Sequence, residues 1–497
     1  MDELQRLIGI IERHNSKPVV DLADNKSYES RYYNLVRKNA VASDIEAVKA
    51  LYGVTVEALP TNYRMLKSRL KSKLYDHLLM IDLGGTNSSS SVLEEHELRQ
   101  ELHKSRILFM LNEHDLLRKI IDKVIRSAKE SVYNDIVLEA LEIKRKVDLY
   151  SLKQIPFQSI NQEIQYFKDI VWLEKNAEDI FFNLRFDLNF NVSKKRASLN
   201  HLPQKIDQIK DMWLKTGSYK IFEYFFLLQN HYLELIGDYE EILKFNNEVK
   251  LMHRNGELNH KRFNVQLNAF VQIYACLRTS RLTEGLTLAE ASLELIAPSD
   301  VNWFANMENY FLLAMHSQNY ALAAELIAKV YESPHYYLQN NLSKERWALM
   351  RAFLSIVMQH RLTPEDKEAL GNATMISKDK QGFNVFLLVL EFVEFLCKEI
   401  DDSEAELLMD RYRKYISNYL RGYMAERARL FLRFMIQILK EQCSYLRVSL
   451  ESKSMFKKLK VTKPPGEAYA EVEIVPYEHL WELVLDILKK KSELPAS

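Results

Sequence analysis

Apolar residues recur at three- and four-residue spacing along most of the chain, which is the period of an amphipathic α-helix. Residues 86–155 contain no Gly or Pro, and this stretch predicts successive helices joined by polar breaks such as NEHD, residues 112–115. The same pattern returns over residues 160–184. Because breaks this short bring consecutive helices back alongside each other, the pattern predicts antiparallel helix pairs.

The two ends of the chain depart from this pattern. At the N-terminus the sequence predicts short helices over residues 28–41, 44–52 and 62–79. Near the C-terminus the turn signal KPPG, residues 463–466, precedes a rough alternation of Ala470, Val472 and Ile474 with glutamates. This alternation predicts one short strand, with residues 445–450 as a candidate hairpin partner, and a terminal helix that begins after Pro476.

Composition narrows the fold class. The chain has only 12 glycines and 11 prolines among 497 residues, less than half of the roughly 12% that average usage supplies. Enzymes of the α/β class and β-sandwiches need Gly- or Pro-marked turns at short intervals, so both are disfavoured. Hydrophobic residues make up 47%, and 68 basic residues balance 68 acidic ones, which excludes a disordered chain or a general polyanion binder. The composition predicts an all-α protein.

The middle of the chain carries an internal repeat. Three segments share the layout of apolar helix, short polar turn and second helix, and their second helices are predicted to begin at Tyr239, Leu282 and Tyr320. The starts lie roughly 40 residues apart, a spacing typical of helical repeats. Gly285 and Ala323 are small enough to let two helices approach closely at a crossing point. Such pairs become stable only when they stack in series, which favours an α-solenoid over an irregular helical domain without a groove.

Two turns in this region identify a resemblance. GDYEEIL, residues 237–243, and QNYALAAELIAKVYESP, residues 318–334, resemble the turn and second helix of the tetratricopeptide repeat family. Tyr320 and Ala323 fall at the aromatic and small packing positions of that family, and Pro334 closes the helix. The resemblance covers about residues 217–364. Phe311 and Ile242 depart from the small residues expected at their positions.

The resemblance implies a concave groove lined by the first helix of each pair. The residues that it places in a partner-binding groove are His231, Tyr274, Arg278, Glu308, Asn309 and His316. The patterns along the whole chain divide it into five regions. These are an N-terminal short-helix region (1–83), irregular helical hairpins (92–216), repeats (217–364), further hairpins (365–462), and a turn, strand and terminal helix (463–497).

A basic helix near the N-terminus gives a second hypothesis. Leu66, Leu70, Leu74 and Leu78 form one apolar stripe over residues 63–79. The rest of this helix carries the positive side chains of Arg64, Lys67, Arg69, Lys71 and Lys73. Such a helix can contact nucleic-acid phosphates, it can bind an acidic protein, or it can be a solvated face over an apolar seam. It has no trio of Asn, Gln or Arg side chains placed to read bases.

Motifs for catalysis or cofactor binding are weak. MIDLGGTN, residues 80–87, resembles the first phosphate motif of sugar kinases, but its flanks have helical period and the glycines for a second motif are missing. His96-Glu97-Leu98-Arg99-Gln100 lacks the second histidine of a zinc helix, and His103 lies a further turn away. We find no arrangement typical of a nucleophile, an acid–base pair or a metal site. The sequence therefore predicts a non-enzymatic protein without a cofactor or metal.

The remaining signals concern location. Cys276, Cys397 and Cys443 lie far apart in apolar helical stretches, a pattern typical of a reducing compartment. The first residues have acids where an export signal has bases, and no segment is apolar enough to span a membrane. We expect a cytoplasmic scaffold that binds a protein or peptide. The alternative is a regulator with a nucleic-acid-binding N-terminal module and a repeat region that acts as a sensor.

Overall fold

The chain is all-α throughout the part that its computed structural model describes, namely residues 2–14, 26–55, 57–79, 81, 83, 90–149, 154–190, 199–373, 383–398, 401–420, 426–462 and 472–493. Over these ranges it forms 23 α-helices and one short 3₁₀ helix, η3 (Tyr336–Leu338), and no strand. It divides into two compact units, Met1–Glu113 and His114–Ser497.

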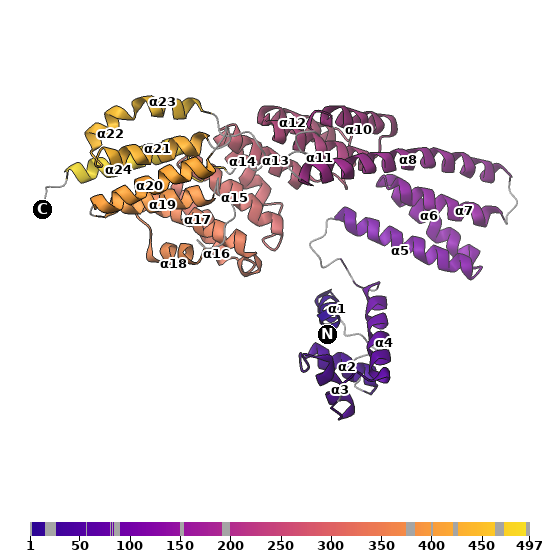
Figure 1. The fold of residues 1–497 in the computed structure, drawn as a ribbon. Helices are drawn as coiled ribbons and strands as arrows, with labels where there is room; N and C mark the ends of the chain where they lie inside the picture. The colour runs from indigo at the N-terminus through magenta and orange to yellow at the C-terminus, as the bar shows by residue number, and fades with distance from the viewer. Residues whose placement is uncertain are drawn as a thin grey trace. The chain divides into compact units, whose positions relative to one another are not determined.

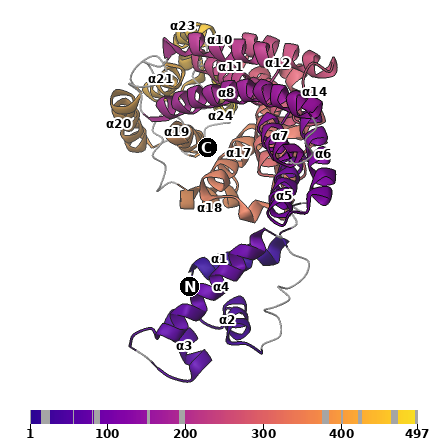
Figure 2. The same cartoon turned by 90° about the vertical axis from the view of Figure 1, so that its right-hand side faces the viewer.

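The first unit packs short helices around buried tyrosines. Helices α1 and α4 lie side by side (Figures 1 and 2), and α2 contacts both of them. Tyr32, Tyr33 and Tyr63 are fully buried between them, and the predicted leucine stripe of α4 faces this core. The predicted short helices are confirmed to within a few residues. The helices are α1 (Asp2–His14), α2 (Tyr28–Arg37), α3 (Asp44–Tyr52), α4 (Thr61–Leu78) and α5 (Ser90–Met110).

In the second unit each described helix from α6 to α17 packs against the next one along the chain (Figure 1), whereas toward the C-terminus α19 packs against α17, α21 and α24. One hydrophobic core extends from α13 to α24. The helices are α6 (His114–Glu130), α7 (Asn134–Leu149), α8 (Gln154–Phe190), α10 (Leu202–Thr216), α11 (Tyr219–Ile236), α12 (Tyr239–Arg254), α13 (Val265–Arg278), α14 (Leu282–Leu293), α15 (Val301–His316), α16 (Tyr320–Glu332), α17 (Asn341–Gln359), α18 (Pro364–Ala373), α19 (Phe383–Cys397), α20 (Asp402–Tyr419), α21 (Glu426–Lys440), α22 (Tyr445–Glu451), α23 (Lys453–Val461) and α24 (Tyr477–Glu493).

One turn geometry recurs between consecutive helices. At Gly237, Ser280 and Gln318 the backbone adopts a left-handed φ of 73°, 59° and 58°. The amide of the following residue then bonds the carbonyl five positions back, as Asn319 N does to Ala314 O at 2.9 Å. This is a Schellman motif, which satisfies the last carbonyls of a helix and stops it. The same motif ends α5, α6 and α12 at Asn112, Val132 and Gly256.

The residue after two of these turns caps the next helix. The carboxylate of Asp238 accepts a hydrogen bond from Glu241 N at 3.1 Å, and the Asn319 amide oxygen accepts one from Leu322 N at 3.2 Å. A helix stop followed at once by an N-cap leaves no room for a longer loop. The predicted starts of the second helices at Tyr239, Leu282 and Tyr320 are therefore confirmed.

Small residues lie where helices come closest. A Cβ atom added to Gly285 of α14 would lie 2.7 Å from Leu313 Cδ2 of α15 and 3.0 Å from Cys276 Cβ of α13. Ala323 of α16 is fully buried. Gly285 has the close-approach role expected from the sequence, and the burial of Ala323 is consistent with that role.

Buried amides connect three helices across the same region. The Asn246 side chain (α12) donates to Asn230 Oδ1 (α11) at 2.5 Å, and Asn268 Nδ2 (α13) donates to Asn246 Oδ1 at 2.9 Å. Gln272 extends the chain to Asn268 Oδ1 at 3.3 Å. All four side chains are buried. Because an unsatisfied buried amide is costly, this hydrogen-bond chain fixes the register of α11, α12 and α13.

The predicted C-terminal strand is wrong where the structure describes it. Residues 472–475 are not in a strand, and the candidate partner segment, residues 445–450, lies in helix α22. Glu473 and Glu478 instead bind the buried Arg427 of α21, with Arg427 Nε to Glu473 Oε1 at 2.6 Å and Nη2 to Glu478 Oε2 at 2.7 Å. Ion pairs, not a backbone ladder, hold this segment. Residues 463–471 lie outside the described part. The terminal helix after Pro476 is confirmed as α24, and it buries Trp481.

We expect Gly285→Ala to destabilise the protein by about 1 kcal/mol. Alanine gains roughly 1 kcal/mol of helix propensity over glycine, but crowding a packed core costs about 1–3 kcal/mol. Gly9 in α1 is the matched control, because a Cβ there meets nothing within 4 Å. Urea unfolding should show lower stability for Gly285→Ala and no loss for Gly9→Ala. Equal effects at the two positions would contradict close helix approach at Gly285.

Candidate functional site

Two of the predicted groove residues lie in a cluster of tyrosine and arginine side chains. The Arg278 guanidinium, at the end of α13, is 4.9 Å from the centre of the Tyr239 ring and 5.9 Å from that of Tyr274. The two rings meet edge to face with centroids 5.9 Å apart. Tyr274 and Arg278 share a helix face because they are four residues apart, and Tyr239 comes from the start of α12. The contacts are cation–π interactions.

The charge of this cluster comes from its arginine and nearby acids. Burial raises the pKa of Tyr239 and of Tyr274 above the ordinary phenol value, and Arg278 opposes the rise in both. Both phenols are therefore neutral at physiological pH. His231, a third predicted groove residue, lies on α11 with its Nδ1 atom 3.8 Å from a carboxylate oxygen of Glu234.

Glu308 forms an ion pair at the neighbouring helices. Its Oε1 atom (α15) is 3.0 Å from Arg346 Nε of α17. Burial raises the pKa of Glu308, and the charge of Arg346 opposes this. The charge of Arg346 also opposes the rise in the pKa of Tyr274, so Arg346 acts electrostatically on both Glu308 and Tyr274. Arg346 was not among the predicted groove residues, although α17 lies within the residues that the resemblance covers.

The other two predicted groove residues are covered. Asn309 is only 7% exposed, because it follows Glu308 and so points about 100° away around the helix. His316 donates its Nε2 hydrogen to the carbonyl oxygen of Glu473 at 2.6 Å. Burial lowers the pKa of His316 to about 4. The segment that precedes α24 therefore occupies the space next to His316.

The basic helix α4 is largely paired within the first unit. Lys67 Nζ lies 2.7 Å from a carboxylate oxygen of Asp44, while Lys71 and Lys73 bind Glu3 and Glu29. Burial alone would raise the pKa of Asp44, but hydrogen bonds from Lys67 and Tyr63 outweigh it and lower this pKa. Arg64 and Arg69 are exposed. The lysines thus tie α4 to α1, α2 and α3.

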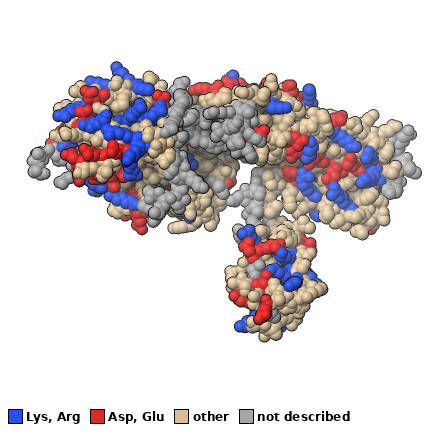
Figure 3. All heavy atoms as spheres, viewed as in Figure 1, with Lys and Arg blue, Asp and Glu red and all other residues tan. Residues whose placement is uncertain are grey.

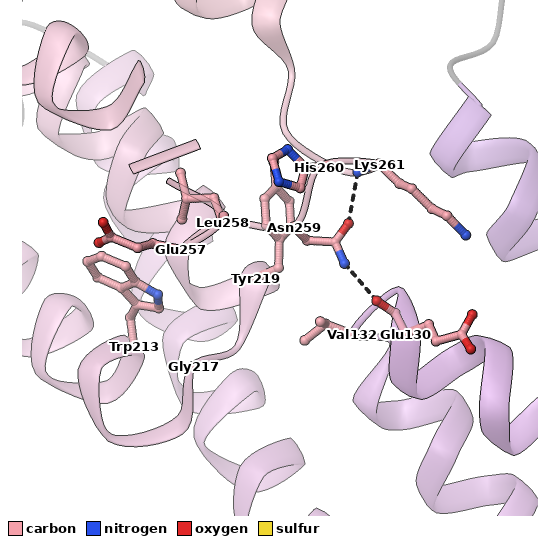
Figure 4. Close-up of a pocket in the computed structure, with 11 residues that line it drawn as sticks. Glu130, Val132, Trp213, Gly217, Tyr219, Glu257, Leu258, Asn259, His260 and Lys261 are labelled. Carbon is pink, nitrogen blue, oxygen red and sulfur yellow. Dashed lines mark hydrogen bonds between the residues drawn. The ribbon is translucent and has the colours of Figure 1, made fainter. Parts of the chain in front are cut away.

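A hollow of about 410 Å³ lies where the α12–α13 connection meets the α6–α7 turn (Figure 4). Trp213, Tyr219, Glu257, His260 and Lys261 are among its lining residues. The connection is held to the turn by two bonds, from Asn259 Nδ2 to Glu130 O at 2.9 Å and from Arg262 Nη1 to Val132 O at 2.7 Å. The Arg262 guanidinium also lies 4.5 Å from the Tyr133 ring centre and 4.6 Å from that of Tyr219.

Two histidines meet beside this hollow. His260 Nδ1 and His253 Nε2 are 3.2 Å apart and share a hydrogen bond. Burial lowers the pKa of His253, and the neighbouring His260 lowers it further. Sequence reasoning missed this pair because seven residues separate the two histidines. The available signal was the polar stretch with a glycine, residues 253–262, between two apolar helices.

We expect Lys67→Met to destabilise the protein by about 1–2 kcal/mol, because it leaves the half-buried carboxylate of Asp44 without its charged partner. Arg69→Met, at an exposed position, should change stability by less than about 0.5 kcal/mol. Urea unfolding measures both effects. If α4 binds nucleic acid instead, Arg69→Met should weaken binding of duplex DNA and reduce its dependence on salt in a fluorescence anisotropy titration.

His316 should make stability fall on acidification. The pKa is about 4 in the folded chain and about 6.5 when unfolded, so between these values the unfolded state binds more protons. The contribution of neutral His316 to the free energy of unfolding is complete above about pH 6.5. It is lost as the pH falls toward 4, where the free energy of unfolding decreases by up to about 1.4 kcal/mol per pH unit. His316→Gln keeps a donor for the carbonyl and should flatten this dependence in denaturant unfolding. The prediction would be contradicted if the stability of the wild type and that of His316→Gln changed with pH in the same way.

Comparison of the chain with protein-family models, with curated proteins and with solved structures finds no match. Among the described residues, no three or more His, Cys, Asp or Glu side chains are placed to hold a metal ion, and none of the described helices is long and apolar enough to cross a membrane. Lys/Arg and Asp/Glu side chains are interspersed on the face in Figure 3. Residues 84 and 85 of the phosphate-like motif lie outside the described part.

Proposed function

We propose that the second unit is a non-enzymatic helical-repeat scaffold that binds a protein or peptide partner through side chains of α11, α13, α15 and α17. The observation that carries the proposal is the meeting of Arg278 with Tyr239 and Tyr274, next to the Glu308–Arg346 ion pair. Arg278 and Tyr274 on α13, Glu308 on α15 and Arg346 on α17 come from alternate helices, and Tyr239 joins them from the start of α12. That is the arrangement in which first helices of stacked pairs share one face.

The proposed architecture is an α-solenoid of antiparallel helix pairs similar to tetratricopeptide repeats. Short Schellman turns between α11 and α12, between α13 and α14 and between α15 and α16 support it, because each turn leaves no length for another topology. Contacts between next-but-one helices α13 and α15 support stacking in series. On this proposal, other pairs extend the same stack toward both ends of the unit.

The chemistry of the cluster suits an extended or helical peptide. Tyrosine and arginine are the residue types that contribute most to protein interfaces, since they combine apolar area with directed hydrogen bonds. Glu234, Glu308, Arg278 and Arg346 provide both signs of charge within a partly buried surface. We infer that a partner's polar groups bind here, and that its apolar side chains enter spaces between helices.

We propose that the protein is located in the cytoplasm, a reducing compartment, and the basis is its three separate cysteines. Cys276, Cys397 and Cys443 are all free thiols, and Cys276 is buried. Burial raises the pKa of Cys276 to about 12, so this thiol is unreactive at neutral pH. These features fit structural cysteines of a protein that never meets an oxidising compartment.

We expect Arg278→Ala to weaken partner binding by roughly tenfold while leaving the helical fold intact. Chemical cross-linking and affinity capture with the wild-type chain identify the partner, and titration of that partner gives the affinities. Arg254→Ala is the matched control, because it removes an equally charged, exposed side chain from the second helix α12. Glu308→Gln tests the adjacent ion pair.

An unchanged affinity for both Arg278→Ala and Glu308→Gln, with unchanged unfolding curves, would remove this face as the binding site. A loss of affinity for Arg254→Ala as large as that for Arg278→Ala would place the binding surface on the second helices instead.

A further inference from the structure

The histidine pair at the end of α12 has the spacing of two ligands on one metal ion. His260 Nδ1 and His253 Nε2 lie 3.2 Å apart. In tetrahedral zinc coordination with Zn–N bonds of about 2.0–2.1 Å, two ligand nitrogens are about 3.3–3.4 Å apart. The difference is smaller than an ordinary side-chain adjustment.

The rings are also inclined to one another in a suitable way. Their centroids are 4.7 Å apart and their planes meet at 64°. Two imidazoles facing each other along the line between these nitrogens would have more distant centroids. At least one ring is therefore inclined to that line, as the ring of a ligand must be when two nitrogens share one ion beside it.

The surrounding backbone holds both rings in place. The His253 ring packs against the Phe263 ring, with centroids 4.7 Å apart and planes inclined at 33°. Gly256 turns the chain at a left-handed φ of 78°, and a Cβ atom there would lie 3.7 Å from His260 Nε2. On the far side of His260, the Asn259 amide oxygen accepts hydrogen bonds from the backbone amides of Lys261 and Arg262 at 3.0 and 3.1 Å. Ligands fixed in this way lose little freedom on binding an ion.

We propose that His253 and His260 together bind one divalent transition-metal ion of the zinc class, with water in the remaining coordination positions. This site lies outside the proposed groove. Imidazole nitrogen suits Zn²⁺, Ni²⁺ and Cu²⁺, whereas Mg²⁺ and Ca²⁺ require oxygen ligands. Binding needs no net loss of a proton, because the imidazole that donates the hydrogen bond moves its hydrogen to its other ring nitrogen. The ion would link α12 to the connection that lines the hollow in Figure 4.

The test is a calorimetric titration of Zn²⁺ into the full-length chain after treatment with a chelator. We expect one saturable site, and His253→Gln or His260→Gln should weaken it by at least about tenfold, since even indirect ligand contacts are worth about 10–100-fold. Glutamine preserves a hydrogen-bonding side chain but is a poor zinc ligand. Zn²⁺ should raise the melting temperature of the wild type and not of the variants. Mg²⁺ should do neither.

His103→Gln is the matched control, because it removes an exposed histidine from α5 and should leave Zn²⁺ affinity unchanged. If His253→Gln folds poorly, His260→Gln carries the test, because His260 is exposed. Zn²⁺ affinity that is equal in the wild type and in His260→Gln overturns the proposal, as does the lack of a saturable site in the wild type. Either result would leave the pair as a simple hydrogen bond.

Discussion

Close contact between consecutive helices is the constraint on which the second unit depends. Its helices are amphipathic, so each leaves an apolar face that only a neighbour can cover. At Gly285 this contact is so close that a side chain on α14 would collide with Leu313 and with Cys276 Cβ. Because Gly285 has no side chain, α13 and α15 can both pack closely against α14. The hydrophobic core that continues to α24 extends from this region.

The turns convert this packing into a fixed direction for each helix. In a Schellman motif the left-handed residue ends one helix, and at Gly237 and Gln318 the very next residue caps the following one. This brings the last residues of one helix close to the first residues of the next. The buried amide chain of Asn230, Asn246 and Asn268 then fixes the register of α11, α12 and α13. The turns and the buried amide chain together place Arg278 within reach of both Tyr239 and Tyr274.

Sequence patterns predicted those elements whose signals are local. The starts of α12, α14 and α16 follow from short polar turns, whereas the choice of Tyr274, Arg278 and Glu308 rests on the family resemblance and stays a prediction. The strand failed because Ile474 and Val475 are both buried, which breaks the alternation, and because Glu473 is held by Arg427, a residue 46 positions away. Likewise, His316 lies on the expected helix face, but a distant segment returns to cover it. Contacts across such distances leave no periodic signal in a single sequence.

The turn at Val132 shows why several helix ends are hard to predict from a sequence with so few glycines. A β-branched residue with a left-handed φ of 58° is strained by roughly 1–2 kcal/mol, so propensity alone would place glycine or asparagine there. The strain is offset by tertiary contacts, because Val132 O accepts a hydrogen bond from Arg262, whose guanidinium also stacks on Tyr133 and Tyr219. The α12–α13 connection and this turn therefore hold each other in place. His260 and the hollow beside it are positioned by that mutual contact, so this part of the molecule is built by residues about 130 positions apart in sequence.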